Sequence, residues 1–108
     1  MREKKAAELL GRRIRGLRKS KNLTQEQLGE RSRISYKHLG AIERGEENPS
    51  LSVLQKIAKG LGVEISELFS FQHEETDSAK LKKMIADLAK DEKVDRLQLI
   101  LKIINAIK

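Results

Sequence analysis

The sequence is organised around one stretch, TQEQLGERSRISYKHLGAIER, which runs from Thr24 to Arg44. It begins with the signals of a helix start, because the Thr24 hydroxyl can accept as an N-cap and Gln27 can reach back to complete a capping box. Ser35 repeats the device at the start of a second helix. The residues between the helices, 31–34, are too few for a flexible loop. The stretch therefore predicts two short helices that meet at a steep angle.

The second helix, residues 35–44, divides into two faces at about 100° per residue. Leu39 and Ile42 form a narrow apolar face, which predicts a contact with the core. The opposite face holds Tyr36, Lys37, Gly40, Ala41 and Arg44. Such a division is typical of a helix-turn-helix, in which the outer face of the second helix enters a groove. This outer face is the candidate binding surface.

The composition points to a cytoplasmic chain with one domain and a small appendage. The 108 residues include no Cys, which excludes disulfides, thiolate metal sites and cysteine nucleophiles and fits a reducing compartment. The N-terminus, MREKK, leads directly into an amphipathic helix pattern, so no signal peptide is expected. We therefore expect a cytoplasmic protein that does not bind a membrane.

Positive charge is concentrated in the part of the chain that holds the helix pair. Residues 1–44 contain 13 Lys and Arg against 5 Asp and Glu, whereas residues 45–108 contain 10 against 11. This asymmetry favours a polyanionic partner, because neutralising phosphates releases counterions. A solvated basic surface explains the charge alone equally well.

The rest of the first 70 residues predicts further helices around the pair. Apolar residues at helical spacing predict a first helix over residues 3–21 and a fourth over residues 51–61, which Ser50 can cap. A short fifth helix is expected at residues 64–69. No run alternates at period two. The fold class is therefore all-α, with a five-helix domain over residues 1–70.

A polar linker, residues 71–77, separates this domain from a C-terminal helical hairpin, residues 78–108. From Leu97 to Ile107 eight of the eleven positions of the final helix are apolar, so that helix must be buried on more than one side. A second copy of the chain would bury it in a four-helix bundle about a two-fold axis. The expected dimer interface residues are Leu97, Ile100, Leu101, Ile104 and Ile107. The alternatives are that the segment folds back on the N-terminal domain or binds a different protein.

Several segments of the five-helix unit share residues and spacing with a known family. The clearest are Leu23-Thr24-Gln25-Glu26-Gln27-Leu28, Ile42-Glu43-Arg44-Gly45, Asn48-Pro49-Ser50 and Leu61-Gly62-Val63. Through them, residues 9–69 resemble the DNA-binding domain of the Cro/C1-type helix-turn-helix regulators, also called the xenobiotic-response-element family. The resemblance implies a five-helix lambda-repressor-like fold and a transcription regulator that binds double-stranded DNA.

The resemblance also implies roles for particular residues. Gln25, first in its helix, would hydrogen-bond a DNA phosphate, helped by the helix N-terminus. Further phosphate contacts are implied for Ser35, Arg44 and Asn48. Arg18 and Glu43 match a family ion pair that ties the first helix to the recognition helix.

One residue of the turn departs from the family pattern. Arg33 stands where the family usually has glycine. It is expected either to adopt a left-handed backbone conformation at some cost or to sit in a slightly different turn.

The outer face of the recognition helix is expected to read base edges. Lys37 can donate to guanine O6 and N7, and Ala41 can touch a methyl group. Tyr36 can either pack on a thymine methyl group or reach a phosphate. Gly40 permits close approach of the backbone. Since Gly40 and Ala41 are both short, DNA shape and phosphate contacts are expected to carry part of the specificity.

Together these features predict a homodimeric, sequence-specific repressor of an inverted-repeat operator. In an alternative, the C-terminal hairpin binds a different protein, as in an antitoxin or a regulator controlled by an antagonist. A small enzyme that binds a phosphorylated substrate is disfavoured, because the sequence contains no catalytic constellation. His38 and His73 are the only histidines and leave no set of metal ligands. The chain is expected to be no enzyme and to use no cofactor or metal.

Overall fold

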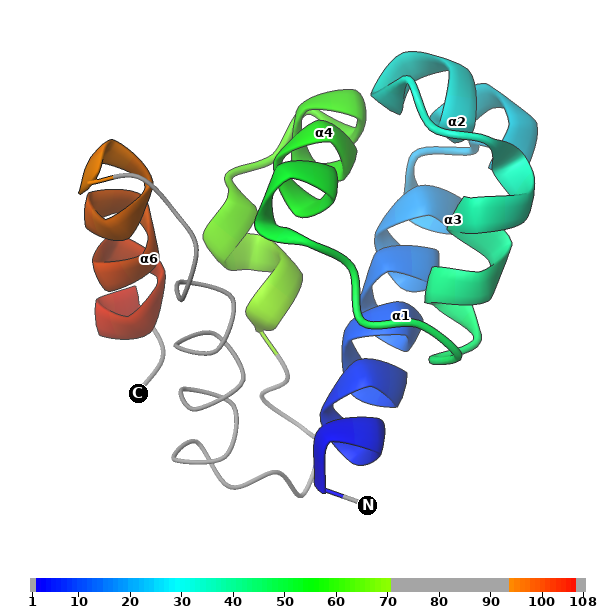
Figure 1. Cartoon of the computed structure of the whole chain (residues 1–108). Helices are drawn as coiled ribbons and strands as arrows, with labels where there is room; N and C mark the ends of the chain where they lie inside the picture. Colours follow the sequence, from blue (N-terminus) through cyan, green and yellow to red (C-terminus); the bar gives the residue numbers. More distant parts are fainter. Residues whose placement is uncertain (1, 71–93, 107–108) are drawn as a thin grey trace.

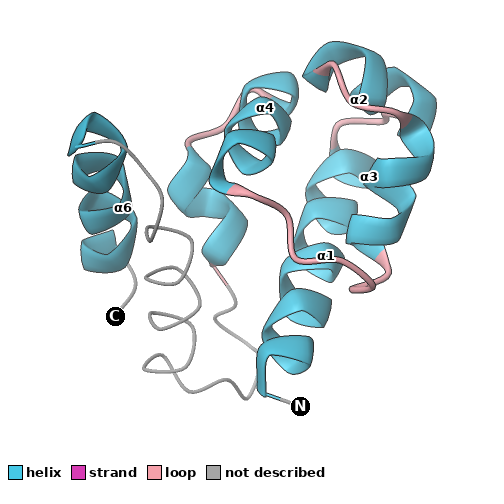
Figure 2. Ribbon diagram, in the orientation of Figure 1, coloured by secondary structure: helices cyan, strands magenta, loops and turns pink. Residues whose placement is uncertain are grey.

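The computed structural model describes residues 2–70 and 94–106 of the chain (Figure 1). Its elements are α1 (Arg2–Ser20), α2 (Gln25–Ser32), α3 (Tyr36–Glu43), α4 (Leu51–Leu61), the 3-10 helix η1 (Ile65–Phe69) and α6 (Val94–Ala106). Within the described ranges only helices and loops are present (Figure 2). The predicted all-α fold is confirmed. The linker expected at 71–77 and the first part of the hairpin expected at 78–108 lie outside the described residues.

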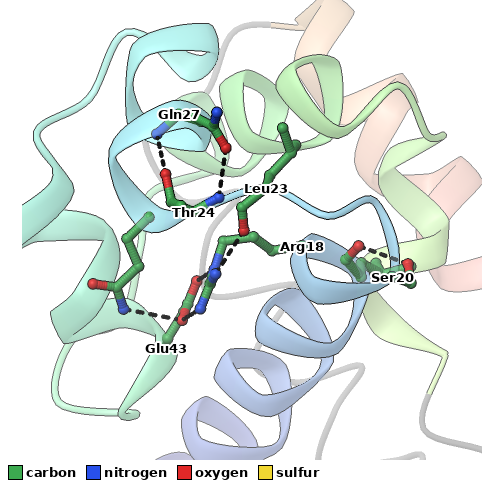
Figure 3. Close-up of polar contacts among 8 residues, drawn as sticks. Arg18, Ser20, Leu23, Thr24, Gln27 and Glu43 are labelled. Carbon is green, nitrogen blue, oxygen red and sulfur yellow. Dashed lines mark hydrogen bonds and ion pairs between the residues drawn. The ribbon is translucent and has the colours of Figure 1, made fainter.

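Side-chain caps begin the helices where the sequence predicts them. Thr24 Oγ1 accepts from the Gln27 backbone N at 3.0 Å, and Gln27 Oε1 accepts from the Thr24 backbone N at 2.9 Å (Figure 3). Ser35 Oγ caps α3 by accepting from the His38 N at 3.0 Å, and Ser50 Oγ caps α4. Each cap satisfies an N–H group that has no partner inside its helix.

The turn between α2 and α3 contains the left-handed residue that the sequence suggested. Arg33 has a φ of 58°, and its N–H bonds to the carbonyl of Glu30. A side chain in this conformation costs roughly 1–2 kcal/mol. The turn packs tightly on Gly29, where an added Cβ would lie 2.9 Å from the carbonyl oxygen of Ile34. The position that needs glycine is therefore Gly29, because the turn backbone passes directly over it.

The helices enclose one core, and the inner side of α3 packs against α1 and α2. α2 lies against α4 and α3, while α1 lies against α3 and η1. Leu39 and Ile42 of α3 are 0% and 1% exposed. Other core residues with no exposed surface are Leu10, Ile14, Leu28, Leu54, Ile57 and Leu68. Because α1 and α2 cover only its inner side, α3 keeps its outer side free.

The C-terminal helix packs on its own chain. α6 contacts η1, and Ile100 and Ile103 are 3% and 1% exposed and belong to the main core cluster. Ile100 was expected at a dimer interface, but here it is already buried within one chain, as in the fold-back alternative. Leu101 is 58% exposed and stays available to a second copy. The side chains of the other expected interface residues, Leu97, Ile104 and Ile107, lie outside the described part.

Candidate nucleic-acid interface

The outer side of α3 is open to solvent, as the two-face pattern predicts. Tyr36 is 49% exposed, Lys37 is exposed and Ala41 is half-buried. Tyr36 is one of two large apolar side chains that are exposed in the described ranges. None of these three residues is needed to fill the core. They are therefore available to a ligand that approaches α3 from outside.

A buried ion pair fixes α3 from behind. Arg18 Nε donates to Glu43 Oε2 at 2.7 Å, and Arg18 Nη2 donates to Glu43 Oε1 at 3.0 Å (Figure 3). Arg18 Nη1 also donates to the Leu23 carbonyl oxygen at 2.8 Å. The two side chains are only 10% and 2% exposed. The ion pair predicted from the family resemblance is thus present, and it joins α1, the loop before α2 and the end of α3.

Gln25 belongs to the same network. Its Nε2 donates to Glu43 Oε1 at 3.2 Å, so the first residue of α2 is tied to the last residue of α3. Gly40 lies beside it and is buried. A Cβ added to Gly40 would lie 3.1 Å from Arg44 Nη1 and 3.5 Å from Gln25 Nε2. The side chains of Gln25 and Arg44 therefore cover the point where the sequence suggested close approach to a base.

The loop after α3 brings two acidic side chains back onto α3 and its cap. Arg44 Nε donates to Glu46 Oε2 at 2.9 Å and Nη2 to Glu46 Oε1 at 3.2 Å. This hydrogen bonding raises the pKa of Arg44 and lowers the pKa of the Glu46 carboxyl. His38 Nε2 lies 3.0 Å from Glu47 Oε2. Sequence reasoning missed both contacts, because neither the two-residue spacing of Arg44 and Glu46 nor the nine-residue spacing of His38 and Glu47 predicts an ion pair.

The remaining predicted phosphate contacts lie at the two ends of α3. Ser35 is exposed, and its hydroxyl oxygen accepts the helix cap. Asn48 is exposed in the loop before α4 and borders a hollow that Ala7 and Arg44 also line. Gln25 lies beside Gly40 in the middle of α3, Ser35 lies at its start, and Asn48 borders the same hollow as Arg44 at its end. That arrangement suits a ligand with negative charge on both sides of the helix.

Two findings concern other kinds of site. Within residues 2–70 and 94–106, no group of three or more His, Asp or Glu residues could hold a metal ion. In the same part of the chain, every helix is too short or too polar to cross a bilayer.

Comparisons with known proteins point to one family. A family model, HTH_3, described as helix-turn-helix, matches residues 14–68. The immunity repressor protein of Bacillus phage phi105 is 46% identical over 57 residues, which cover 53% of this chain and 40% of the repressor. The match thus spans less than half of that relative. The uncharacterized HTH-type transcriptional regulator YazB of Bacillus subtilis is 45% identical over 62 residues, covering 57% of this chain and 90% of YazB.

Two solved structures are similar to this chain, and each covers 58% of it. The restriction-modification controller protein C.AhdI from Aeromonas hydrophila has a TM-score of 0.58 and 40% identity, covering 58% of this chain and 96% of that chain. The clp gene regulator ClgR from C. glutamicum has a TM-score of 0.56 and 32% identity, covering 58% of this chain and 82% of that chain.

Proposed function

Because this chain belongs to the HTH_3 helix-turn-helix family, we propose that it is a transcriptional repressor that binds double-stranded DNA sequence-specifically. The observation that carries the proposal is the open side of α3, where Tyr36 is 49% exposed while Leu39 on the opposite side is fully buried. A helix presented in this way fits the major groove of B-DNA, which is about 12 Å wide. The proposal includes no catalytic step and no cofactor.

The residues around α3 divide into two groups in this proposal. Lys37, Tyr36 and Ala41 face the base edges from the first turns of α3. Gln25, Ser35, Arg44 and Asn48 contact phosphates on either side of the groove. The buried Arg18–Glu43 pair keeps the two groups in a fixed relation, since it joins α1 to the end of α3 at 2.7 Å. Gly40 lies next to the side chains of Gln25 and Arg44, so its backbone approaches a base only where those two side chains move aside.

Selection from random duplexes tests the proposal directly. Binding of the full chain followed by amplification of the bound fraction is expected to enrich one short sequence. Enrichment of two copies related by a dyad would support a dimer that places two recognition helices roughly 34 Å apart. If repeated rounds enrich no sequence, the chain does not read DNA through α3.

Lys37→Ala is expected to relax base preference at one operator position by about 1–3 kcal/mol. Gln25→Ala is expected to weaken binding to all duplexes alike, because a phosphate contact carries no sequence information. Binding assays with single-base variants of the selected duplex would measure both effects. Lys56→Ala, which removes an exposed positive charge from α4, is the matched control. If Lys37→Ala lowers affinity equally for every variant duplex, Lys37 is a phosphate contact.

We also propose that the chain is a homodimer through the exposed side of α6. Leu101→Asp replaces an apolar side chain that is 58% exposed in the single chain, so the fold should survive while the dimer weakens. The dimer dissociation constant is expected to rise by about tenfold or more, since a buried leucine contributes roughly 1.5–3 kcal/mol. Light scattering over a concentration series measures it. Lys59→Asp, at an exposed position on α4, should leave the dimer intact.

Two results would contradict the dimer proposal. A wild-type chain that stays monomeric at all concentrations rules it out. A Leu101→Asp chain that dimerises as tightly as wild type moves the interface to another surface.

A further inference from the structure

Glu46 holds the Arg44 guanidinium in the way that a phosphate would. Two parallel N–H groups, Nε and Nη2, reach the two carboxylate oxygens at 2.9 and 3.2 Å. A carboxylate and a phosphate both match this fork of donors, so they compete for the same face of an arginine. The third nitrogen, Nη1, lies over Gly40, 3.1 Å from where a Cβ would stand. The guanidinium is therefore already placed against α3, with its fork occupied.

The Arg44–Glu46 ion pair is charged at neutral pH and is exposed to solvent. Hydrogen bonding to Arg44 lowers the pKa of the Glu46 carboxyl, so this carboxyl stays ionised until the pH falls below its ordinary titration range. The two side chains are 60% and 57% exposed. Exposed ion pairs of this kind are weak because water screens them, so a phosphate can compete with the carboxylate for the guanidinium. The displaced carboxylate keeps its charge beside the phosphate.

We propose that Glu46 is an internal competitor for DNA phosphate: it occupies Arg44 in the free chain and lowers the affinity for every duplex. The inference rests on the proposed DNA-binding function and adds a contact within the chain that sets the affinity for DNA. DNA binding must first release Arg44 and must then tolerate a carboxylate close to the phosphate. Both costs are independent of base sequence, so the ratio of specific to non-specific affinity stays unchanged.

Glu46→Gln tests the inference in the full chain. Fluorescence anisotropy would measure binding to a mixed-sequence duplex and to the selected duplex across a series of NaCl concentrations. Both duplexes should bind about three- to tenfold more tightly at moderate salt, and the plot of log affinity against log salt should steepen by about one. The gain should be the same factor for both duplexes.

Two controls separate the contact from the change in net charge. Glu30→Gln removes one negative charge at an exposed position on α2 and should give a smaller gain. In a chain that already carries Arg44→Ala, Glu46→Gln should raise the affinity for DNA no more than Glu30→Gln does. A gain equal to that of Glu30→Gln, or a gain that persists without Arg44, would overturn the inference while leaving the proposed function in place. If neither wild type nor any variant binds either duplex, the proposed function fails and this inference fails with it.

Discussion

Glu43→Ala is expected to lower the free energy of unfolding by about 3–5 kcal/mol, because it leaves a buried arginine without its partner. Arg18 would keep only its bond to the Leu23 carbonyl, and its Nε and Nη2 donors would face a site that excludes water. Urea denaturation followed by circular dichroism measures the loss, which should appear as a lower midpoint with an unchanged slope. Glu30→Ala, at an exposed position, should change the midpoint little.

A double variant shows whether the stability lost in Glu43→Ala comes from the unpaired charge of Arg18 or from the lost side-chain volume. Arg18→Met with Glu43→Leu removes both charges and keeps apolar bulk, so it should recover most of the stability lost by Glu43→Ala. The stability of the wild-type pair should also depend little on salt, because the two side chains are only 10% and 2% exposed and screening acts mainly on exposed charges. If Glu43→Ala is no less stable than Glu30→Ala, the ion pair does not hold α3.

Gly11→Ala should lower the free energy of unfolding by about 1–3 kcal/mol, the usual cost of forcing extra atoms into a packed interior. An added Cβ would lie 2.3 Å from the carbonyl oxygen of Ile42 and 2.6 Å from that of Glu43. These are backbone atoms at the end of α3, so neither can move aside without shifting the helix. The close contact of α1 with α3 therefore depends on glycine at position 11.

Gly16→Ala on the same helix is the matched control and should change stability in the opposite direction. No atom lies within 4 Å of a Cβ added there, so only helix propensity acts, and the gain is expected to be about 0.5–1 kcal/mol. Urea midpoints of the two variants and wild type would rank Gly16→Ala above wild type and Gly11→Ala below. If both substitutions stabilise the chain, α1 and α3 do not meet as closely as described.

The predictions that local sequence supports are those the structure confirms most directly. Thr24, Ser35 and Ser50 cap the helices at which they were expected, since each bond spans only three residues. The two faces of α3 follow from helical periodicity, and Leu39 and Tyr36 lie on the sides predicted for them. The contact of Arg18 with Glu43 has no local signal, because the residues are 25 positions apart. It was expected only from the resemblance to a family.

The sequence by itself determined where the helices begin, which sides are apolar and which part of the chain is basic, because these properties depend on neighbours within one or two turns. Only the tertiary structure decided that Gly11 contacts the end of α3, that Ile100 is buried within one chain, and that Glu46 occupies the fork of Arg44. Each of these depends on how side chains and backbone meet in space. Periodicity predicts that a surface will be buried, but the choice among possible partners depends on the packing of the whole chain.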